Sequence, residues 1–116
     1  MPVIHTHVSV HTTPEQREAL KTAYGKAITA LPGKSEGWLM CPFEDNMPIY
    51  FGGDDSQPAA YVEVNAFGHA AAPRAAWESL SAQIMPALES VLGIPQNRVY
   101  IRYTMTEDWG WNGSNF

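Results

Sequence analysis

A succession of strand, helix and strand is repeated along this chain, and this repetition limits its possible folds more than any other feature. The first succession covers about residues 2–51 and the second about residues 59–116. Two βαβ units of this kind share one sheet, against which their helices pack. The pattern therefore predicts a single domain over residues 1–116 with an α+β fold. In this two-layer sandwich, a four-stranded mixed sheet carries two helices on one face.

The first unit contains recognisable signals for each of its elements. Residues 3–10 alternate and are rich in β-branched side chains, which is typical of a strand. Thr13 and Gln16 then have the spacing of a capping box, and apolar residues follow at helical spacing. Residues 38–43 and, after a turn, residues 49–51 are further predicted strands.

The second unit repeats this order. Residues 60–67 alternate as a strand, Pro73 opens a helix, and Gly93 ends it before a last strand over residues 99–104. Pro86 lies inside the helical pattern, where its missing N–H removes one backbone hydrogen bond. We therefore expect this helix to be kinked.

The predicted strands have one polar and one apolar face. His5 and His7 share a face of the first strand, Glu63 lies on the polar face of the third, and Tyr100 and Arg102 share a face of the last. Isoleucine and valine occupy the opposite faces. Two helices cover only one face of a sheet, which we expect to be the apolar one. The polar face keeps aromatic residues, which suits a subunit interface in a symmetric oligomer.

The composition excludes several classes of protein. The net charge of −5 argues against nucleic acid as a partner, because binding to nucleic acid needs clustered cations. No apolar stretch approaches the roughly 20 residues of a transmembrane helix, so no membrane partner is expected. Cys41 is the only cysteine, which excludes an intramolecular disulfide. We expect a cytoplasmic protein without a signal peptide, and export by another route stays open.

His5 and His7 invite a zinc interpretation, because two imidazoles on one strand face can share a metal ion. The other two histidines, His11 and His69, lie elsewhere in the chain. No cysteine or second histidine pair completes a site at a familiar spacing. We therefore predict no metal site and no cofactor.

Five short motifs resemble the macrophage migration inhibitory factor family of the tautomerase superfamily, along almost the whole chain. The motifs are Met1-Pro2 leading into a strand, Gly33-Lys34 after the first helix, Phe51-Gly52-Gly53 with Pro58 shortly after, Asn97-Arg98-Val99-Tyr100-Ile101, and Gly110-Trp111-Asn112-Gly113-Ser114-Asn115-Phe116 at the end. Each motif alone is weak, whereas their order and spacing together are specific.

The resemblance implies a homotrimer whose sheets line a central channel, with active sites at the subunit boundaries. It also implies an isomerase that interconverts the keto and enol forms of phenylpyruvate-type substrates. The catalytic base would be the amine of Pro2, freed by removal of Met1. Such an amine has a reference pKa of about 7.7–8.0, which burial and a neighbouring cation lower further, and a general base needs a pKa near the working pH.

The resemblance also assigns residues to the binding of an aryl-pyruvate. By position, Lys34 would contact the substrate carboxylate and Phe67 would contact the substrate through its backbone. Tyr100 of the neighbouring subunit would line the pocket and donate a hydrogen bond to the developing enolate oxygen. Trp111 and Phe116 would form apolar walls.

Some residues depart from the family pattern. Arg102 stands where asparagine is common and would add a bidentate carboxylate contact, while Trp109 would narrow the pocket. Residues 58–61 lack the Cys-x-x-Cys of the mammalian cytokines, so thiol redox activity is not expected.

Alternative functions stay open at this point. One is a cytokine-like signalling ligand with a receptor as its partner and a vestigial pocket. Another is a dehalogenase- or decarboxylase-type reaction of the same superfamily. Arg74 and Arg102 suit that reaction, but no matching acid accompanies them.

Overall fold

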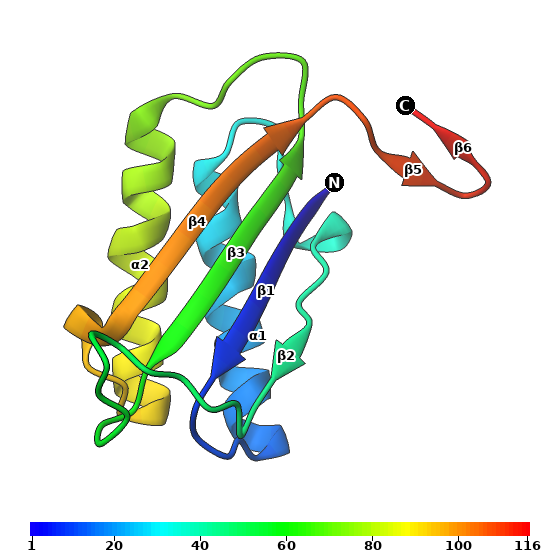
Figure 1. The fold of residues 1–116 in the computed structure, drawn as a ribbon. Coiled ribbons are helices and arrows are strands. Elements are labelled where there is room, and N and C mark those ends of the chain that lie inside the picture. Colours follow the sequence, from blue (N-terminus) through cyan, green and yellow to red (C-terminus); the bar gives the residue numbers. More distant parts are fainter.

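The computed structural model describes residues 1–116 and confirms the α+β architecture, with two helices on one face of a four-stranded mixed sheet (Figure 1). The main elements are, in chain order, β1 (Pro2–Val8), α1 (Pro14–Ala27), β2 (Phe43–Glu44), β3 (Ala60–Phe67), α2 (Arg74–Leu92), β4 (Val99–Thr106), β5 (Gly110–Trp111) and β6 (Ser114–Asn115). Three short 3₁₀ helices span Ile28–Ala30, Glu36–Trp38 and Gln96–Arg98.

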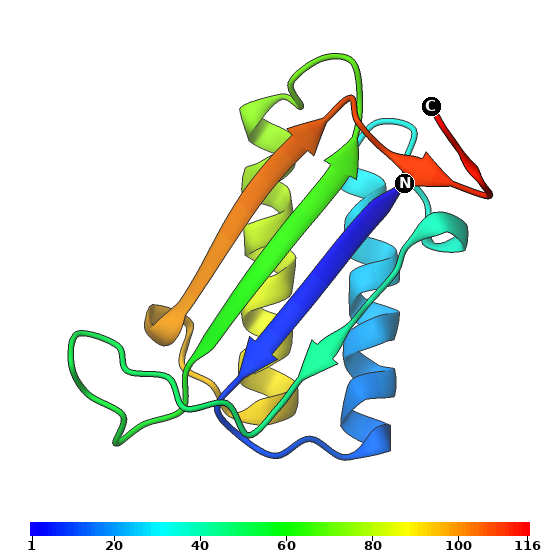
Figure 2. The same cartoon turned by 45° about the vertical axis from the view of Figure 1, so that its right-hand side comes forward.

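The strand order of the main sheet is β2-β1-β3-β4. β1 runs parallel to β2 and antiparallel to β3, and β3 runs parallel to β4. Figure 2 shows both helices behind this sheet, on the same side of it. Neither helix is long and apolar enough to cross a membrane.

The helix ends follow their predicted local signals. The hydroxyl of Thr13 accepts a hydrogen bond from the Gln16 backbone N–H at 3.2 Å, and the Gln16 side chain accepts one from the Thr13 N–H at 2.9 Å. This capping box begins α1 as predicted. α2 ends at Gly93, whose φ of +70° suits a residue without Cβ. Despite Pro86, α2 is assigned as one helix through Leu92.

The core lies between the sheet and the two helices. Ile4, Val62 and Val64 of the sheet are fully buried there, together with Leu20 of α1 and Leu80 of α2. These strand residues alternate with the polar ones, as predicted, so the histidines of β1 lie on the sheet face that the helices leave open.

One polar pair is included in this core. The Thr6 hydroxyl and the Tyr24 hydroxyl are 2.8 Å apart and both side chains are fully buried. Burial raises the pKa of Tyr24, so this hydroxyl stays neutral. Each buried hydroxyl therefore has a hydrogen-bond partner, as buried polar groups require.

The prediction of a strand over residues 38–43 was wrong in its bounds. Regular pairing with β1 is confined to Phe43–Glu44, preceded by an isolated bridge between Val3 and Met40. Pro42 interrupts the ladder because it has no N–H to donate, although its carbonyl accepts from Thr6 at 3.1 Å. Likewise, the strand predicted over residues 49–51 is reduced to one bridge between Phe51 and Asp54.

The last residues form a separate two-stranded hairpin of β5 and β6. Its turn residues, Asn112 and Gly113, have φ of +53° and +82°, as a tight two-residue hairpin turn requires. Figure 1 shows this hairpin away from the main sheet, on the side where the chain begins. The hairpin is therefore placed to form a wall near the N-terminus.

Candidate active site

The beginning of β1 borders a hollow of about 380 Å³. Its lining residues are Met1, Pro2, Val3, Gly37, Trp38, Leu39, Met40, Trp109, Gly110 and Trp111. Pro2 is buried and lies opposite Ala66 of β3. Backbone hydrogen bonds hold both sides of this strand end, from Met40 to the Pro2 carbonyl at 3.1 Å and from Phe67 to the Met1 carbonyl at 3.1 Å. The position of the chain start is therefore fixed by the sheet.

Lys34 lies next to this chain start. Its backbone N–H caps the turn after α1 by donating to the Leu31 carbonyl at 3.1 Å. Its ammonium group donates to the Phe67 carbonyl at 2.6 Å and lies 5.7 Å from the centre of the Phe67 ring. Burial, followed by the charge of Lys34, lowers the pKa of the Met1 amine, which is the terminal amine of the uncleaved chain. Both effects favour a neutral amine, which is the form that accepts a proton.

Aromatic side chains continue from Phe67 to the hairpin. The ring centroids of Phe67 and Phe116 are 5.2 Å apart, and Trp111 stacks on Phe116 at 6.2 Å. Trp38 meets Trp111 edge to face at 5.1 Å. Trp109 is partly buried and lines the same hollow as Trp111. The structure thus places Trp109 and Trp111 beside Pro2 at this hollow, and Phe116 connects Trp111 to Phe67.

Sequence reasoning missed Trp38. The residue was assigned to a strand, whereas it ends a 3₁₀ helix and lines the hollow beside Pro2. The signal available in the sequence was the presence of four tryptophans in this chain. In the structure three of them, Trp38, Trp109 and Trp111, line this one hollow.

Two predicted site residues on β4 lie away from Pro2 of the same chain, Tyr100 at the far end of the sheet and Arg102 near the middle of the strand. Tyr100 pairs with Tyr61, whereas Phe67 pairs with Thr106, six positions further along β4. At about 3.3 Å per residue this separation is roughly 20 Å. Tyr100 is two-thirds exposed, and Arg102 lies two residues after it on the same face. One chain therefore does not bring Tyr100 or Arg102 to its own Pro2.

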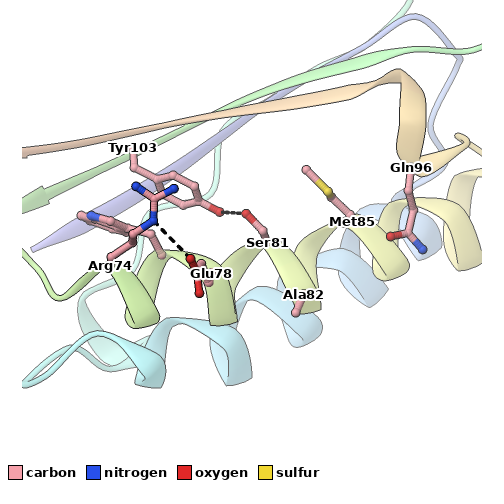
Figure 3. Close-up of a pocket in the computed structure, with 8 residues that line it drawn as sticks. Arg74, Glu78, Ser81, Ala82, Met85, Gln96 and Tyr103 are labelled. Carbon is pink, nitrogen blue, oxygen red and sulfur yellow. Dashed lines mark hydrogen bonds and ion pairs between the residues drawn. The ribbon is translucent and has the colours of Figure 1, made fainter.

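The largest hollow, of about 560 Å³, lies elsewhere, between α2 and β4 (Figure 3). Along it the Arg74 guanidinium contacts the Glu78 carboxylate at 3.2 Å, and the Ser81 and Tyr103 hydroxyls are 2.6 Å apart (Figure 3). Trp77 stacks on Tyr103 at 4.8 Å. None of the predicted catalytic or substrate-binding residues lines this groove, and Arg74 is paired on its own helix rather than placed beside Pro2.

Cys41 has the surroundings of an unreactive thiol. Burial raises the pKa of the Cys41 thiol to about 11, so the nucleophilic thiolate is scarce at neutral pH. The expectation that thiol chemistry plays no part agrees with this environment.

Comparisons with known proteins agree with this fold. The sequence model of the macrophage migration inhibitory factor family matches residues 1–116. A macrophage migration inhibitory factor homolog of Trichuris trichiura is 30% identical, with all of both chains covered. The crystal structure of Leishmania major MIF2 has a TM-score of 0.91 and 37% identity, covering 100% of this chain and 97% of that one. A homologue from Prochlorococcus marinus has a TM-score of 0.81 and 29% identity, with 98% of each chain covered.

Proposed function

Because the chain belongs to the macrophage migration inhibitory factor family of the tautomerase superfamily, we propose that it tautomerises phenylpyruvate-type substrates with the Pro2 amine as general base. The observation that carries this proposal is the surroundings of Pro2. It is buried at the start of β1, beside an aromatic-lined hollow, and the chain terminus lies next to Lys34. Removal of Met1 turns the amide nitrogen of Pro2 into a secondary amine with a basic lone pair.

The proposed reaction moves one proton between carbon and nitrogen. In the keto-to-enol direction, the Pro2 nitrogen takes a proton from the carbon beside the keto group. The electron pair of the broken C–H bond forms the carbon–carbon double bond, while the carbonyl π pair moves to the oxygen, which takes up a proton from water. The protonated Pro2 amine then returns a proton to water, so the net change is one proton moved from carbon to oxygen. In the reverse direction, the protonated amine returns its proton to carbon.

Two physical properties support Pro2 in this role. The reference pKa of an α-amine, about 7.7–8.0, is nearer to neutral pH than the value of about 10.4 for a lysine side chain. The pyrrolidine ring also fixes the direction of the amine relative to β1. An oriented base lowers the entropic cost of reaching the reactive geometry.

The direct test is the tautomerisation rate of hydroxyphenylpyruvate, followed by the ultraviolet absorbance of the enol. The protein is prepared without a tag, and mass spectrometry first confirms that Met1 is absent. We expect turnover well above the uncatalysed rate. No turnover by protein with a free Pro2 terminus would refute the proposal.

Lys34 is proposed to hold the substrate carboxylate and to keep the amine neutral. For enolisation, kcat/KM is expected to rise with pH and level off above the pKa of the Pro2 amine, because only the unprotonated amine accepts a proton. The midpoint should lie below the reference range of an α-amine, because burial and Lys34 lower the pKa of the Met1 amine at this chain start and should act in the same direction on a free Pro2 amine. In Lys34→Ala we expect a higher midpoint. We also expect a plateau about 10–100-fold lower, equivalent to losing a hydrogen bond to a charged group, about 1.5–3 kcal/mol.

The pH–rate profiles of the wild type and Lys34→Ala check this prediction. Lys26→Ala is the matched control, because Lys26 is an exposed cation at the end of α1. A wild-type midpoint at or above about 8.0, the upper reference value for an α-amine, contradicts the lowered pKa. A Lys34→Ala profile that coincides with that of Lys26→Ala contradicts the role of Lys34.

We further propose that the complete site forms between neighbouring copies in a homotrimer. The supporting observation is the position of Tyr100, which lies at the end of the sheet away from Pro2 of the same chain, and of Arg102, which lies two residues after it opposite Glu63. From a neighbouring chain, Tyr100 would donate to the enolate oxygen and Arg102 would contact a carboxylate. The expected solution mass is that of three chains, measurable by light scattering at assay concentration. An active monomer would contradict this arrangement.

A further inference from the structure

Three potential metal ligands meet on the open face of the sheet. Parallel pairing of β1 and β2 sets His7 opposite Glu44, and His5 lies two residues before His7 on the same face. The Glu44 carboxylate oxygen Oε2 is 2.8 Å from His5 Nε2 and 3.0 Å from His7 Nε2. The donor atoms of all three side chains lie within 4.8 Å of one another. Glu44 is thus the third donor that the sequence alone did not place beside the two histidines.

We propose that His5, His7 and Glu44 bind a divalent transition-metal ion of the zinc class. Two imidazoles and one carboxylate are a ligand set that zinc uses when its fourth position is left to a water molecule. A tetrahedral ion with bonds of about 2.0–2.2 Å sets its ligand atoms roughly 3.4 Å apart. The two separations from Glu44, 2.8 and 3.0 Å, therefore need to widen by a few tenths of an ångström, and the separation of the two histidine donor atoms, at most 4.8 Å, has to adjust to the same value.

The hydrogen bonding of the cluster is compatible with this exchange. An ionised carboxylate only accepts hydrogen bonds, so His5 donates from Nε2 to Glu44 in the metal-free protein, while His7 Nε2 lies at ion-pair distance from the same oxygen. An ion would bind each ring through an Nε2 atom that carries no proton. The carboxylate oxygen that both Nε2 atoms approach would become a ligand itself.

Of the three proposed ligands, His7 is held in place by its surroundings and Glu44 is open to solvent. The His7 side chain is only 11% exposed, and its ring stacks on Tyr61 with centroids 5.6 Å apart. The Glu44 side chain is 53% exposed, which gives an ion and its water a path from solvent. Glu63, the residue opposite His5 on β3, adds a negative charge to the same face. A partly immobilised ligand, an entry path and a favourable charge are what a metal site requires.

The proposal is tested by zinc binding to untagged protein. Equilibrium dialysis against Zn²⁺ with elemental analysis should give one ion per chain. A Co²⁺ titration should give the visible absorption of a four-coordinate site. We expect Glu44→Gln and His5→Gln each to weaken binding by at least about tenfold, the smallest loss usual even for residues that only support a metal ligand. Both side chains are partly exposed, so neither change removes a buried core group.

His11→Gln is the matched control, because His11 also lies near a carboxylate, 3.7 Å from Asp45, but its side chain is 73% exposed and has no second histidine beside it. Binding that survives both site variants, or that His11→Gln removes, overturns the proposal. Saturation at one ion per three chains also overturns it, since the ion would then be shared between subunits. Circular dichroism of each variant confirms that a loss of binding is not a loss of fold.

Discussion

Pro2→Gly is expected to lower kcat for hydroxyphenylpyruvate tautomerisation by about 10²-fold, the lower end of what a positioned general base contributes. The glycine variant keeps a terminal amine, but that amine loses the ring that fixes its direction in β1. Inserting an alanine between Met1 and Pro2 converts the Pro2 nitrogen into an amide. The loss in that variant should therefore reach about 10²–10⁴-fold.

Steady-state kinetics of the three proteins, each with its N-terminus checked by mass, measure this effect. Pro48→Gly is a suitable control, because Pro48 is exposed and lies in the loop after β2. Both terminal variants should keep the melting temperature of the wild type within a few degrees. The loss of kcat then reflects the catalytic step and not the stability of the fold. Wild-type kcat in the alanine insertion would show that the nitrogen of Pro2 is not the base.

Leu80→Ala should destabilise the fold by about 2–5 kcal/mol, the usual cost of truncating a buried leucine. Leu80 is fully buried on α2 and belongs to the core between helices and sheet. The free energy of unfolding of a small domain is about 5–15 kcal/mol, so the variant should lose a large part of its stability. The melting temperature should fall by at least about 6 °C, because each kcal/mol lowers it by roughly 3 °C or more in a domain between the size classes of 60–100 and 150–250 residues.

Thermal and urea unfolding, monitored by circular dichroism, measure the expected loss of stability in Leu80→Ala. Both are run at one fixed protein concentration, because an oligomer gains stability with concentration. Leu92→Ala is the matched control, since Leu92 is the last residue of α2 and only partly buried. Equal losses in the two variants would contradict the assignment of Leu80 to the centre of the core.

The elements with strong local signals were predictable from the sequence. β3 has the predicted bounds, Ala60–Phe67, because alternation and flanking loop residues both act within a few positions. The start of α1 depends on the Thr13 side chain, which caps the helix, and the end of α2 depends on Gly93, which takes up the left-handed conformation because it has no Cβ.

The contacts between distant segments were not predictable in the same way. Glu44 reaches His5 across 39 positions, and only the register of a two-residue strand places it there. Such a short strand has too few alternating side chains to specify register from sequence. Trp38 was missed for a related reason, since its place beside Pro2 depends on how an irregular segment follows β1.

Under the proposed function, the hairpin of β5 and β6 would separate substrate recognition from folding. No residue after Met105 belongs to the hydrophobic core or packs against it, whereas Trp111 and Phe116 stand beside the hollow at Pro2. A two-stranded hairpin of this kind adds little stability of its own. Most mutations in a marginally stable domain are selected against because they lower its stability. Mutations in these last residues should lower the stability of the domain less. Descendants of such a gene can change what the site accepts while the sheet and helices stay the same, and a directed-evolution library is best concentrated there.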